Sequence, residues 1–518
     1  MRKTALVAAV LVCACTAAQR VERAPAAPAP VPDAGPPQPP PPPPPPPDPV
    51  VIVRHQDSPV VAVRLLFRAG SVDDPAGQAG ATSLAADWMA EATQALDAAA
   101  LAEALFPWAT YITTRTDRET AVFGMSVHRD VAALAIPLLF DVVTHPRLDP
   151  ADLERLRHDA VAAIEKGLRR ADDEELGWAA LQRFLWDGHP YAALVDGHVG
   201  SLTALTGAQL RAHAARVFTR ARLVAGLGGG FDPETERIFR VAIQRIPPGE
   251  AWEPVPLPPV PPPSGGLRIH LVQKDTESTP ITLGFRHALT RAHPDFVPLM
   301  VAVSALGEHR QMGGRLFQRM REERGLNYGS YAYLEHFVEE GDGPQAALNI
   351  PCRQHAFSLW VRPVAAADRA FALRQVLREW RAFVSDGLTE EEFQRTRDFL
   401  RGYTRLAEQG ARRRLAWAMD DHLNGTPEFL RHARMRMETL TRDEVNAAIR
   451  RHLQAEHLVA TLLAPDAEAL RAALLSGAPS QRANVPAALA EEDAAIAAYD
   501  LQLGPGALTI TPAAELFR

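Results

Sequence analysis

The chain has 518 residues, of which 47% are hydrophobic, and it carries a formal net charge of −7. This apolar content is ordinary for globular domains, and the length suggests two to four of them. The mild acidic balance, with no basic stripe, argues against nucleic acid as a partner. Two of the three Cys lie in the first fifteen residues, which leaves one Cys for the folded part and excludes an internal disulfide framework.

The N-terminal residues 1–15 are typical of an export signal. Arg2 and Lys3 precede an apolar stretch that is too short to span a bilayer. The sequence Val-Cys-Ala-Cys15 resembles a bacterial lipobox in which Cys15 would receive the lipid, and Thr16 in place of Asp favours the outer membrane by the same resemblance. We therefore expect an outer-membrane lipoprotein of the bacterial cell envelope that faces the periplasm. The alternative is an ordinary signal peptide that is cleaved, so that the protein is exported without a lipid.

Proline-rich stretches divide the rest of the chain. Residues 16–49 are rich in Pro and Ala, a composition that favours polyproline II and predicts a stiff tether. A second such stretch, 247–266, predicts a surface linker between domains at 50–246 and 267–470. Residues 471–518 are Ala-rich and weakly patterned, and the sequence assigns them no role.

The two predicted domains repeat one pattern. A capping box begins a helix at Thr206 and again at Thr441, and each helix leads at the same separation into a Leu-Val-Ala strand. Upstream, Asp149 and Thr389 begin a second matching pair of helices. Each copy also opens with two strand patterns, at 50–53 and 60–67 in the first copy and at 267–272 and 281–285 in the second. This mixture of strands and helices predicts an α+β fold, in which two tandem domains each pack helices on a largely antiparallel sheet.

Two motifs resemble the insulinase/pitrilysin-type zinc peptidases, the inverzincins that include mitochondrial processing peptidase. Residues 67–80 are similar to the entry of the active-site helix of that family, and residues 314–328 are similar to a signature of its second domain. The resemblance covers roughly residues 50 to 470 and implies two insulinase-like domains. The metal site of the family is a His-x-x-Glu-His helix with a distant Glu, in which the first Glu activates a zinc-bound water.

The first copy departs from that metal site at every position. With Gly80 placed on the glycine of the family, Ser83 and Asp87 stand where the two His ligands belong. Ala86 replaces the general base, and Ile164 replaces the distant Glu. Because Ser is a poor zinc ligand and Ala takes no proton, the resemblance implies that this chain has no metal site and binds no cofactor of its own.

No other metal motif replaces the lost one. The chain has 17 His, but none of them belongs to a His-x-x-Glu-His or a His-Glu-x-x-His sequence. We interpret them as surface or hydrogen-bonded histidines.

The second copy keeps the Arg/Tyr pair of the family, here Arg321 and Tyr328, with Gly325 as the turn between them. In related two-part enzymes, this pair comes from a second domain or a partner chain and faces the zinc. Guanidinium and phenol are both hydrogen-bond donors, suited to hold a substrate carbonyl and a developing oxyanion. A helix with an exposed Arg and a core Tyr is the structural alternative.

These observations favour a non-catalytic subunit of a heterodimeric insulinase-like peptidase. A partner with an intact zinc-binding helix would supply the zinc, and the substrate would be a peptide of limited size. A stand-alone pseudopeptidase that binds peptides or envelope components is the first alternative. An active hydrolase with an unrelated site is the second, and no motif in the chain supports it.

Overall fold

The computed structural model describes residues 49–308, 312–335, 347–482 and 484–518. The predicted signal peptide, Cys15 and the tether up to residue 48 lie outside the described residues. Within the described ranges, no helix combines the length and the apolar character that crossing a membrane requires.

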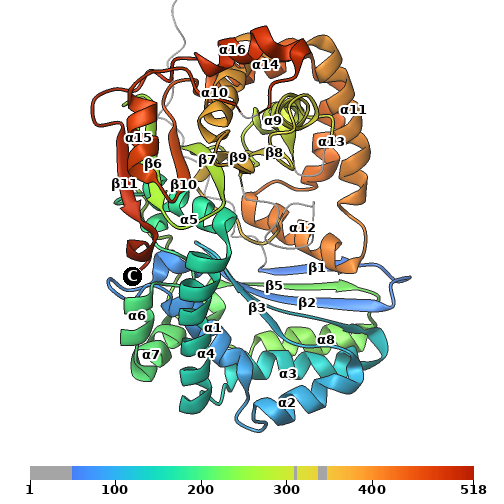
Figure 1. Ribbon diagram of the computed structural model, residues 1–518. Coiled ribbons are helices and arrows are strands. Elements are labelled where there is room, and N and C mark those ends of the chain that lie inside the picture. Colours follow the sequence, from blue (N-terminus) through green and yellow to red (C-terminus); the bar gives the residue numbers. More distant parts are fainter. Residues whose placement is uncertain (1–48, 309–311, 336–346, 483) are drawn as a thin grey trace, which may run out of the picture. The chain divides into compact units, whose positions relative to one another are not determined.

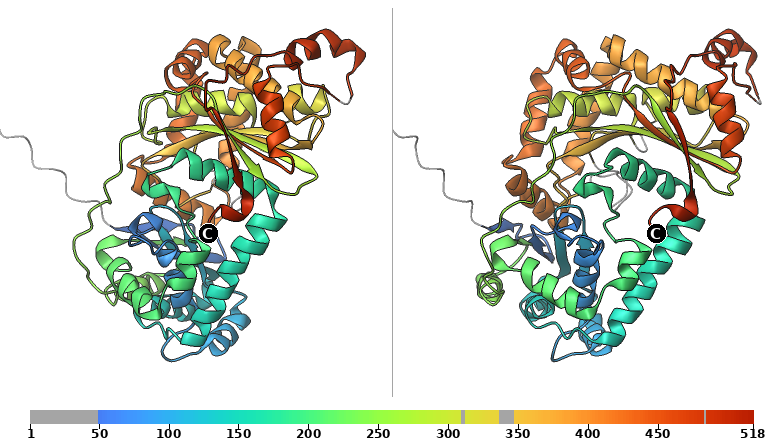
Figure 2. Two further views of the ribbon diagram at one scale, coloured as in Figure 1. Left: turned by 60° about the vertical axis from the view of Figure 1, so that its left-hand side comes forward. Right: turned by 90° about the vertical axis from the view of Figure 1, so that its left-hand side faces the viewer.

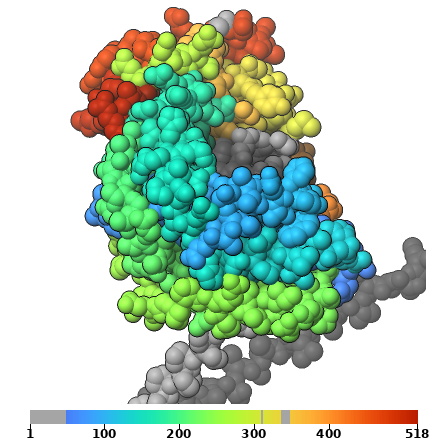
Figure 3. Space-filling model, turned by 90° about the horizontal axis from the view of Figure 1, so that it is seen from below, coloured from blue at the N-terminus to red at the C-terminus, as the bar shows by residue number. Residues whose placement is uncertain are grey.

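The first half of the folded region is a sheet with helices packed on one face (Figure 1). The strand order is β1-β5-β2-β4-β3, in which β1 and β5 are parallel and the other pairs are antiparallel. Seen from below, residues of this half, coloured blue to green, make up most of the surface (Figure 3). The strands are β1 (Val50–Arg54), β2 (Val60–Phe67), β3 (Thr113–Thr116), β4 (Ala121–His128) and β5 (Leu223–Gly229). The helices are α1 (Ala81–Glu91), α2 (Ala98–Leu105), α3 (Ala132–Thr144), α4 (Pro150–Ala162), α5 (Asp173–Leu185), α6 (Val199–Ala204), α7 (Gly207–Val217) and α8 (Pro233–Ile243), with a π-helical segment η4 (Ala163–Ala171) after α4.

The second half repeats this arrangement and adds one strand at the edge. Its sheet has the order β11-β6-β10-β7-β9-β8, with β11, β6 and β10 mutually parallel. The strands are β6 (Arg268–Gln273), β7 (Ser278–His287), β8 (Ser330–Tyr333), β9 (His355–Ala365), β10 (Val459–Ala464) and β11 (Leu508–Pro512). The helices are α9 (Phe296–Gly307), α10 (Arg369–Asp386), α11 (Glu390–Leu406), α12 (Ala411–Asn424), α13 (Phe429–Thr439), α14 (Arg442–His452), α15 (Ala467–Leu475) and α16 (Ala490–Ala497), with a π-helical turn η7 (Phe317–Glu322).

The predicted duplication and the α+β class are confirmed by the sheet topology. The order β1-β5-β2-β4-β3 maps strand by strand onto β6-β10-β7-β9-β8, including the one parallel pair. The predicted capping boxes are also present, since the Gln209 amide donates to the Thr206 hydroxyl and the Glu444 amide donates to the Thr441 hydroxyl, both at 3.3 Å. Reciprocal capping of this kind satisfies two helix-terminal N–H groups at once.

The Pro-rich stretch 247–266 contains no helix or strand and is mostly exposed. Side chains of the second half hold its backbone carbonyls: Arg353 donates to Val255 O at 2.8 Å and Gln354 donates to Pro258 O at 2.7 Å. The stretch therefore lies along the body of the protein as a fixed connection.

The residues beyond 470 are part of both halves, which the sequence did not predict. Strand β11 pairs with β6 at the edge of the second sheet. The residues that follow it turn back, and Ala513, Leu516 and Phe517 are buried in the hydrophobic core of the first half. Figure 2 shows this red segment ending beside the green helices of the first half.

Each sheet receives a helix from the other half on its second face. Helix α12 packs on β1, β2 and β5, and its Leu415 and Met419 are fully buried against that sheet. Helix α5 packs on β7 and β10 of the second sheet, where Leu181 and Leu185 are buried. Because these contacts are made by large apolar side chains, they join the two halves by hydrophobic burial.

The close approach of α12 depends on glycine in strand β5. A Cβ atom at Gly228 would lie 2.8 Å from Leu415 Cβ, a part of the helix that cannot move without the backbone. We expect Gly228→Ala to lower the free energy of unfolding by about 1–3 kcal/mol, the typical cost of overpacking a core. Urea unfolding measures this change.

Gly402→Ala in α11 is the matched control, because nothing lies within 4 Å of the added Cβ. An exposed helical Gly replaced by Ala gains up to about 1 kcal/mol. Equal stability of the two variants would show that α12 is not seated on β5 as described.

Candidate functional site

The entry of α1 is fixed by a buried carboxyl group. The amides of Gly80 and Thr82 donate to the two oxygens of Asp74 at 2.7 and 2.8 Å. Gly80 has φ +88°, and a Cβ there would lie 2.7 Å from the carbonyl oxygen of Asp196. Only glycine fits this position, so the loop at residues 196–197 is brought directly beside the start of α1.

The degenerate zinc-motif residues of α1 are engaged in ordinary contacts. The Ser83 hydroxyl donates to Asp196 Oδ1 at 2.8 Å, and the Thr114 hydroxyl of β3 donates to the Asp87 carboxylate. The side chain of Ala86 belongs to the hydrophobic core. The three positions therefore lie on α1 as the alignment with the family predicts, but two are tied to neighbouring polar groups and one is packed.

The fourth position of the motif is apolar. Ile164 is 4% exposed and lies in η4, the π-helical segment that follows α4. The neighbouring Glu165 is exposed, because successive residues of a helix point in different directions around its axis. A short π-helical segment is rare in proteins and is often found at a functional site, and this one places Ile164 opposite α1.

A cavity of about 580 Å³ lies between α1, η4 and α5. Its wall includes three of the four degenerate positions, namely Ser83, Asp87 and Ile164. The lining is mostly apolar and is completed by Trp178 of α5 and by Phe517 from beyond β11. The space around the former metal position is thus retained, although its chemistry has changed.

The wall of the cavity includes the buried carboxyl group of Asp87, whose charged form is unfavourable there. The pKa of Asp87 is raised to about 6, mainly by burial and to a smaller extent by the nearby Asp196 and Glu91 carboxylates, while the hydrogen bond from Thr114 acts in the opposite direction. A carboxyl group in this state is ionised at neutral pH but destabilises the folded chain when it is charged.

The residues at the motif do not fit a zinc ion. A structural or catalytic zinc needs three or four ligands drawn from imidazole, thiolate and carboxylate. The four positions offer a hydroxyl, a methyl group, one carboxylate that already accepts a hydrogen bond, and a branched alkyl chain. We derive no metal chemistry at this position.

One other group in the described part of the chain has metal-binding residue types. His293, Asp295 and His452 place one ligand atom each within 4.8 Å of one another. Their atoms are already engaged: Asp295 accepts from His452 Nε2 at 2.7 Å and pairs with Arg451, while His293 Nδ1 accepts the Asp295 amide. This group lies in the turn before α9 and at the last residue of α14, and it is separate from the cavity lining. His287 is buried and bonded to the Leu334 carbonyl, in agreement with its interpretation as a hydrogen-bonded histidine.

In the second half, the structure brings Arg321 and Tyr328 together. Arg321 lies in η7, and Gly325 reverses the chain with φ +63° while its amide donates to Arg321 O at 2.7 Å. The Arg321 guanidinium carbon then lies 4.8 Å from the centre of the Tyr328 ring. Tyr328 is 67% exposed, so the alternative of a core tyrosine is wrong.

Helix α5 connects this pair to the cavity. Arg362 lies 5.4 Å from the Tyr328 ring centre and donates to Glu174 of α5 at 3.0 Å. One turn further along, Trp178 lines the cavity and packs against aromatic residues of β8 and β9. The Arg/Tyr pair and the former metal position therefore border the same stretch of one helix. Sequence motifs gave no signal for Arg362, Trp178 or Phe517.

Comparison with known proteins shows the family to which both halves belong. The sequence model described as "Insulinase (Peptidase family M16)" matches residues 50–182, and the one described as "Peptidase M16 inactive domain" matches residues 204–400. The chain belongs to the insulinase family. It is a homologue of proteins named as zinc proteases, and its second half matches the model described as an inactive domain.

Relatives named as zinc proteases cover most of the chain. Uncharacterized zinc proteases of Mycobacterium bovis and Mycobacterium tuberculosis are 29% identical over 405 residues, which is 76% of this chain and 86% of theirs. Among solved structures, a peptidase M16 inactive domain from Pseudomonas fluorescens aligns with a TM-score of 0.69 at 22% identity, over 80% of this chain and 95% of that one. A Helicobacter pylori protease aligns over 80% and 96% of the two chains, with a TM-score of 0.67 at 13% identity. These structures share the fold.

We expect the purified chain to hold no stoichiometric zinc, because its motif offers a single carboxylate. Elemental analysis after dialysis checks this expectation, with the double variant His293→Ala/His452→Ala as a control for weak binding by the group formed by His293, Asp295 and His452. About one tightly held zinc per chain that persists in the double variant would contradict the expectation.

Replacement of Asp87 by Asn should change how stability depends on pH. A carboxyl whose pKa is raised in the folded state holds its proton longer there than in the unfolded state, so stability falls as pH rises from about 4 through about 6. Asp87→Asn removes that loss, and we expect a gain of up to about 3 kcal/mol at pH 7.5 and little gain at pH 4.

Thermal unfolding at both pH values measures this effect. Asp159→Asn, which changes an exposed carboxylate on the same cavity wall, is the control and should show no such gain. An equal effect of Asp87→Asn at pH 4 and pH 7.5 would exclude the ionised carboxylate as its cause.

Proposed function

We propose that this chain is the non-catalytic, Arg/Tyr-bearing subunit of a heterodimeric insulinase-like peptidase. The observation that carries the proposal is the asymmetry of the two halves. By its resemblance to the family, the first half has lost all four residues of the zinc motif and has only the Asp87 carboxylate at those positions, whereas the second half holds Arg321 against Tyr328 beside α5. A partner subunit with an intact His-x-x-Glu-His helix would supply the zinc and the general base.

Arg321 and Tyr328 would act on the peptide bond of the substrate. Both side chains donate hydrogen bonds, and neither shares its donors with a buried partner among the described residues. Directed at a peptide carbonyl, they would hold the substrate and stabilise the negative charge that develops on its oxygen. Exposure of Tyr328 supports this role, because a buried phenol could not reach a bound peptide.

The substrate would be a peptide of limited size that binds as an added strand. Strand β3 forms one edge of the first sheet and reaches the cavity through Thr114, which bonds Asp87. A peptide paired with this edge would gain main-chain hydrogen bonds and would pass the cavity with alternate side chains. We place the complex in the cell envelope, anchored through a lipid on Cys15.

A stand-alone peptide-binding protein is the second candidate function. The retained cavity of about 580 Å³ favours it, since an apolar pocket binds side chains without any partner. Affinity purification from the native host separates the two candidates. Stoichiometric recovery of an insulinase-family chain with an intact zinc helix supports the heterodimer, and recovery of the chain alone with bound peptides supports the second candidate.

Tyr328→Phe tests the role of the pair in the reconstituted complex. Loss of one oxyanion donor costs about 10²–10³ in rate, or roughly 3–4 kcal/mol, and we expect kcat/KM for peptide cleavage to fall accordingly. Arg321→Lys should also lower it, because an ammonium does not reproduce the planar guanidinium fork. Because Tyr328 is 67% exposed, Tm should stay unchanged.

Tyr111→Phe, which removes the hydroxyl of another exposed tyrosine, serves as the control and should leave turnover intact. Near-wild-type kcat/KM in both Tyr328→Phe and Arg321→Lys would eliminate the catalytic role of the pair and leave peptide binding as the better account.

A further inference from the structure

The turn between Arg321 and Tyr328 contains a fully buried arginine. The side chain of Arg324 is 0% exposed, although Tyr328, four residues further on, is 67% exposed. Removing a guanidinium from water costs several kcal/mol unless it is paired and fully hydrogen-bonded. The buried guanidinium of Arg324 therefore needs carboxylate partners and hydrogen-bond acceptors for its nitrogens.

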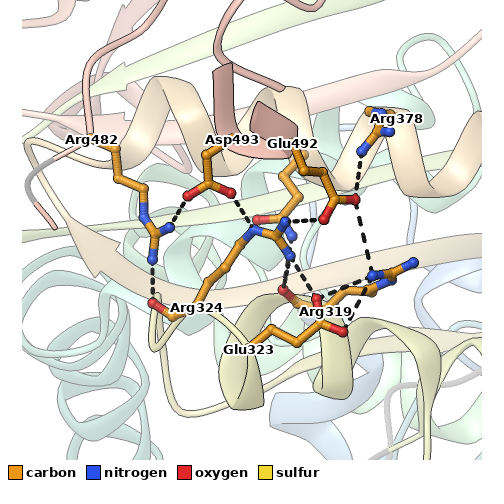
Figure 4. Close-up of polar contacts among 8 residues, drawn as sticks. Arg319, Glu323, Arg324, Arg378, Arg482, Glu492 and Asp493 are labelled. Atoms are coloured by element: carbon orange, nitrogen blue, oxygen red, sulfur yellow. Dashed lines mark hydrogen bonds and ion pairs between the residues drawn. The ribbon is translucent and has the colours of Figure 1, made fainter. Parts of the chain in front are cut away.

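Those partners come largely from the C-terminal segment, by which we mean α16 and the described residues on either side of it (Figure 4). Arg324 Nε donates to Asp493 Oδ1 at 2.8 Å, and Nη2 donates to Glu492 Oε2 at 2.7 Å, both on α16. The remaining nitrogen, Nη1, donates to Glu323 at 2.9 Å and to the Arg319 carbonyl of η7 at 3.0 Å. Every nitrogen of the guanidinium is therefore engaged, and two of the three lead to residues more than 160 positions away in the sequence.

A second buried arginine holds the backbone of the same turn. Arg482 pairs with Asp493 and donates to the carbonyl oxygen of Arg324, the residue before Gly325. Its side chain is 3% exposed, and its guanidinium carbon lies 5.3 Å from the centre of the Phe371 ring of α10. Asp493 is thus the shared anion between one cation on the turn and one on the C-terminal segment.

The C-terminal segment is itself hydrogen-bonded to helix α10. Arg374 of α10 donates to the carbonyls of Ala478, Ala497 and Tyr499, at 2.9, 3.2 and 3.1 Å. These bonds attach the residues on both sides of α16 to the second half. Asp493 and Glu492 are therefore supported by the body of the domain.

We propose that Arg324, clamped by Asp493 and Glu492, is a positioning residue that sets the geometry of the Arg321–Tyr328 pair. The clamp fixes both the side chain and the carbonyl of Arg324, and the next residue is the left-handed Gly325 that directs the chain toward Tyr328. Arg482, Glu492 and Asp493 are in this way part of the candidate site, although they do not line the cavity. The functional consequence rests on the proposed function of the pair, whereas the geometric consequence does not.

Fluorine NMR of the chain labelled with 3-fluorotyrosine tests the geometry directly. The chain has seven tyrosines, and the Tyr328 resonance is assigned by its loss in Tyr328→Phe. Asp493→Asn keeps the shape of the side chain but removes the charge shared by Arg324 and Arg482. We expect it to shift or broaden the Tyr328 resonance and to make that resonance insensitive to Arg321→Lys, which shifts it in the unmodified chain.

Asp73→Asn is the matched control, because Asp73 is also a buried carboxylate paired with an arginine, Arg222, at 2.8 Å in the first half. It should lower Tm to a similar extent and leave the Tyr328 resonance in place. If Asp493→Asn does not fold, Glu492→Gln replaces it, since that side chain is 28% exposed. An unchanged Tyr328 resonance in a folded clamp variant would overturn the proposal and leave the network a purely structural one.

Turnover of the reconstituted complex separates this proposal from the proposed function. A small displacement of a catalytic group costs up to about 10²-fold in rate, so Asp493→Asn should lower kcat/KM, and the double variant Asp493→Asn/Tyr328→Phe should fall no further than Tyr328→Phe. A shifted resonance with full turnover in Tyr328→Phe would uphold the clamp and refute the catalytic role of the pair.

Discussion

The structure depends on an exchange of helices between two copies of one domain. Each sheet is covered on one face by its own helices and on the other by a helix of the opposite copy, α12 on the first sheet and α5 on the second. A sheet with two apolar faces needs two covers, and neither half supplies both. The exchange therefore makes the two halves one hydrophobic body, and it also creates the candidate site, because α5 lies between the former metal position and the Arg/Tyr pair.

The two halves differ in how many energetically unfavourable local features they contain. At the former metal position, a hydroxyl, a methyl group and a branched alkyl chain are easily accommodated in a protein interior, and only the buried Asp87 carboxyl is costly when it is charged. The second half keeps a π-helical turn, a left-handed glycine and a buried guanidinium around an exposed tyrosine. Local strain persists only where surrounding contacts over-determine it, and such sites are often functional. The asymmetry supports a role for the second half in binding and none for the first half in metal chemistry.

The sequence predicted those elements whose signals are local. Capping boxes at Thr206 and Thr441 marked helix starts that the structure confirms, and the strand patterns at Val60–Phe67 and Ile281–Phe285 marked central strands. Family motifs placed Ser83 and Arg321 on the correct elements. These predictions succeeded because capping, periodicity and motif spacing depend on residues only a few positions apart.

Long-range contacts account for what the sequence did not predict. Strand β11 is short and edge-paired, so its pattern was too weak to separate from the Ala-rich residues before it. Asp493 and Arg324 lie 169 positions apart, and nothing in either local pattern indicates that they meet. Phe517 reaches the cavity only because the chain crosses from one half to the other, a path that depends on the assembled fold.

That crossing has a consequence for how the protein folds. The carbonyl of Leu516 accepts a hydrogen bond from Arg169, a contact between residues 347 positions apart, and Leu516 and Phe517 fill part of the core formed by residues 61–246. Contacts of such high sequence separation slow folding, because the closure entropy of the intervening chain is lost before the contact contributes. During synthesis, the first half would emerge with its core incomplete and apolar surface uncovered until more than 260 further residues had been made. A nascent chain of this design exposes apolar surface for a long interval, and it reaches its final packing only after both sheets have formed.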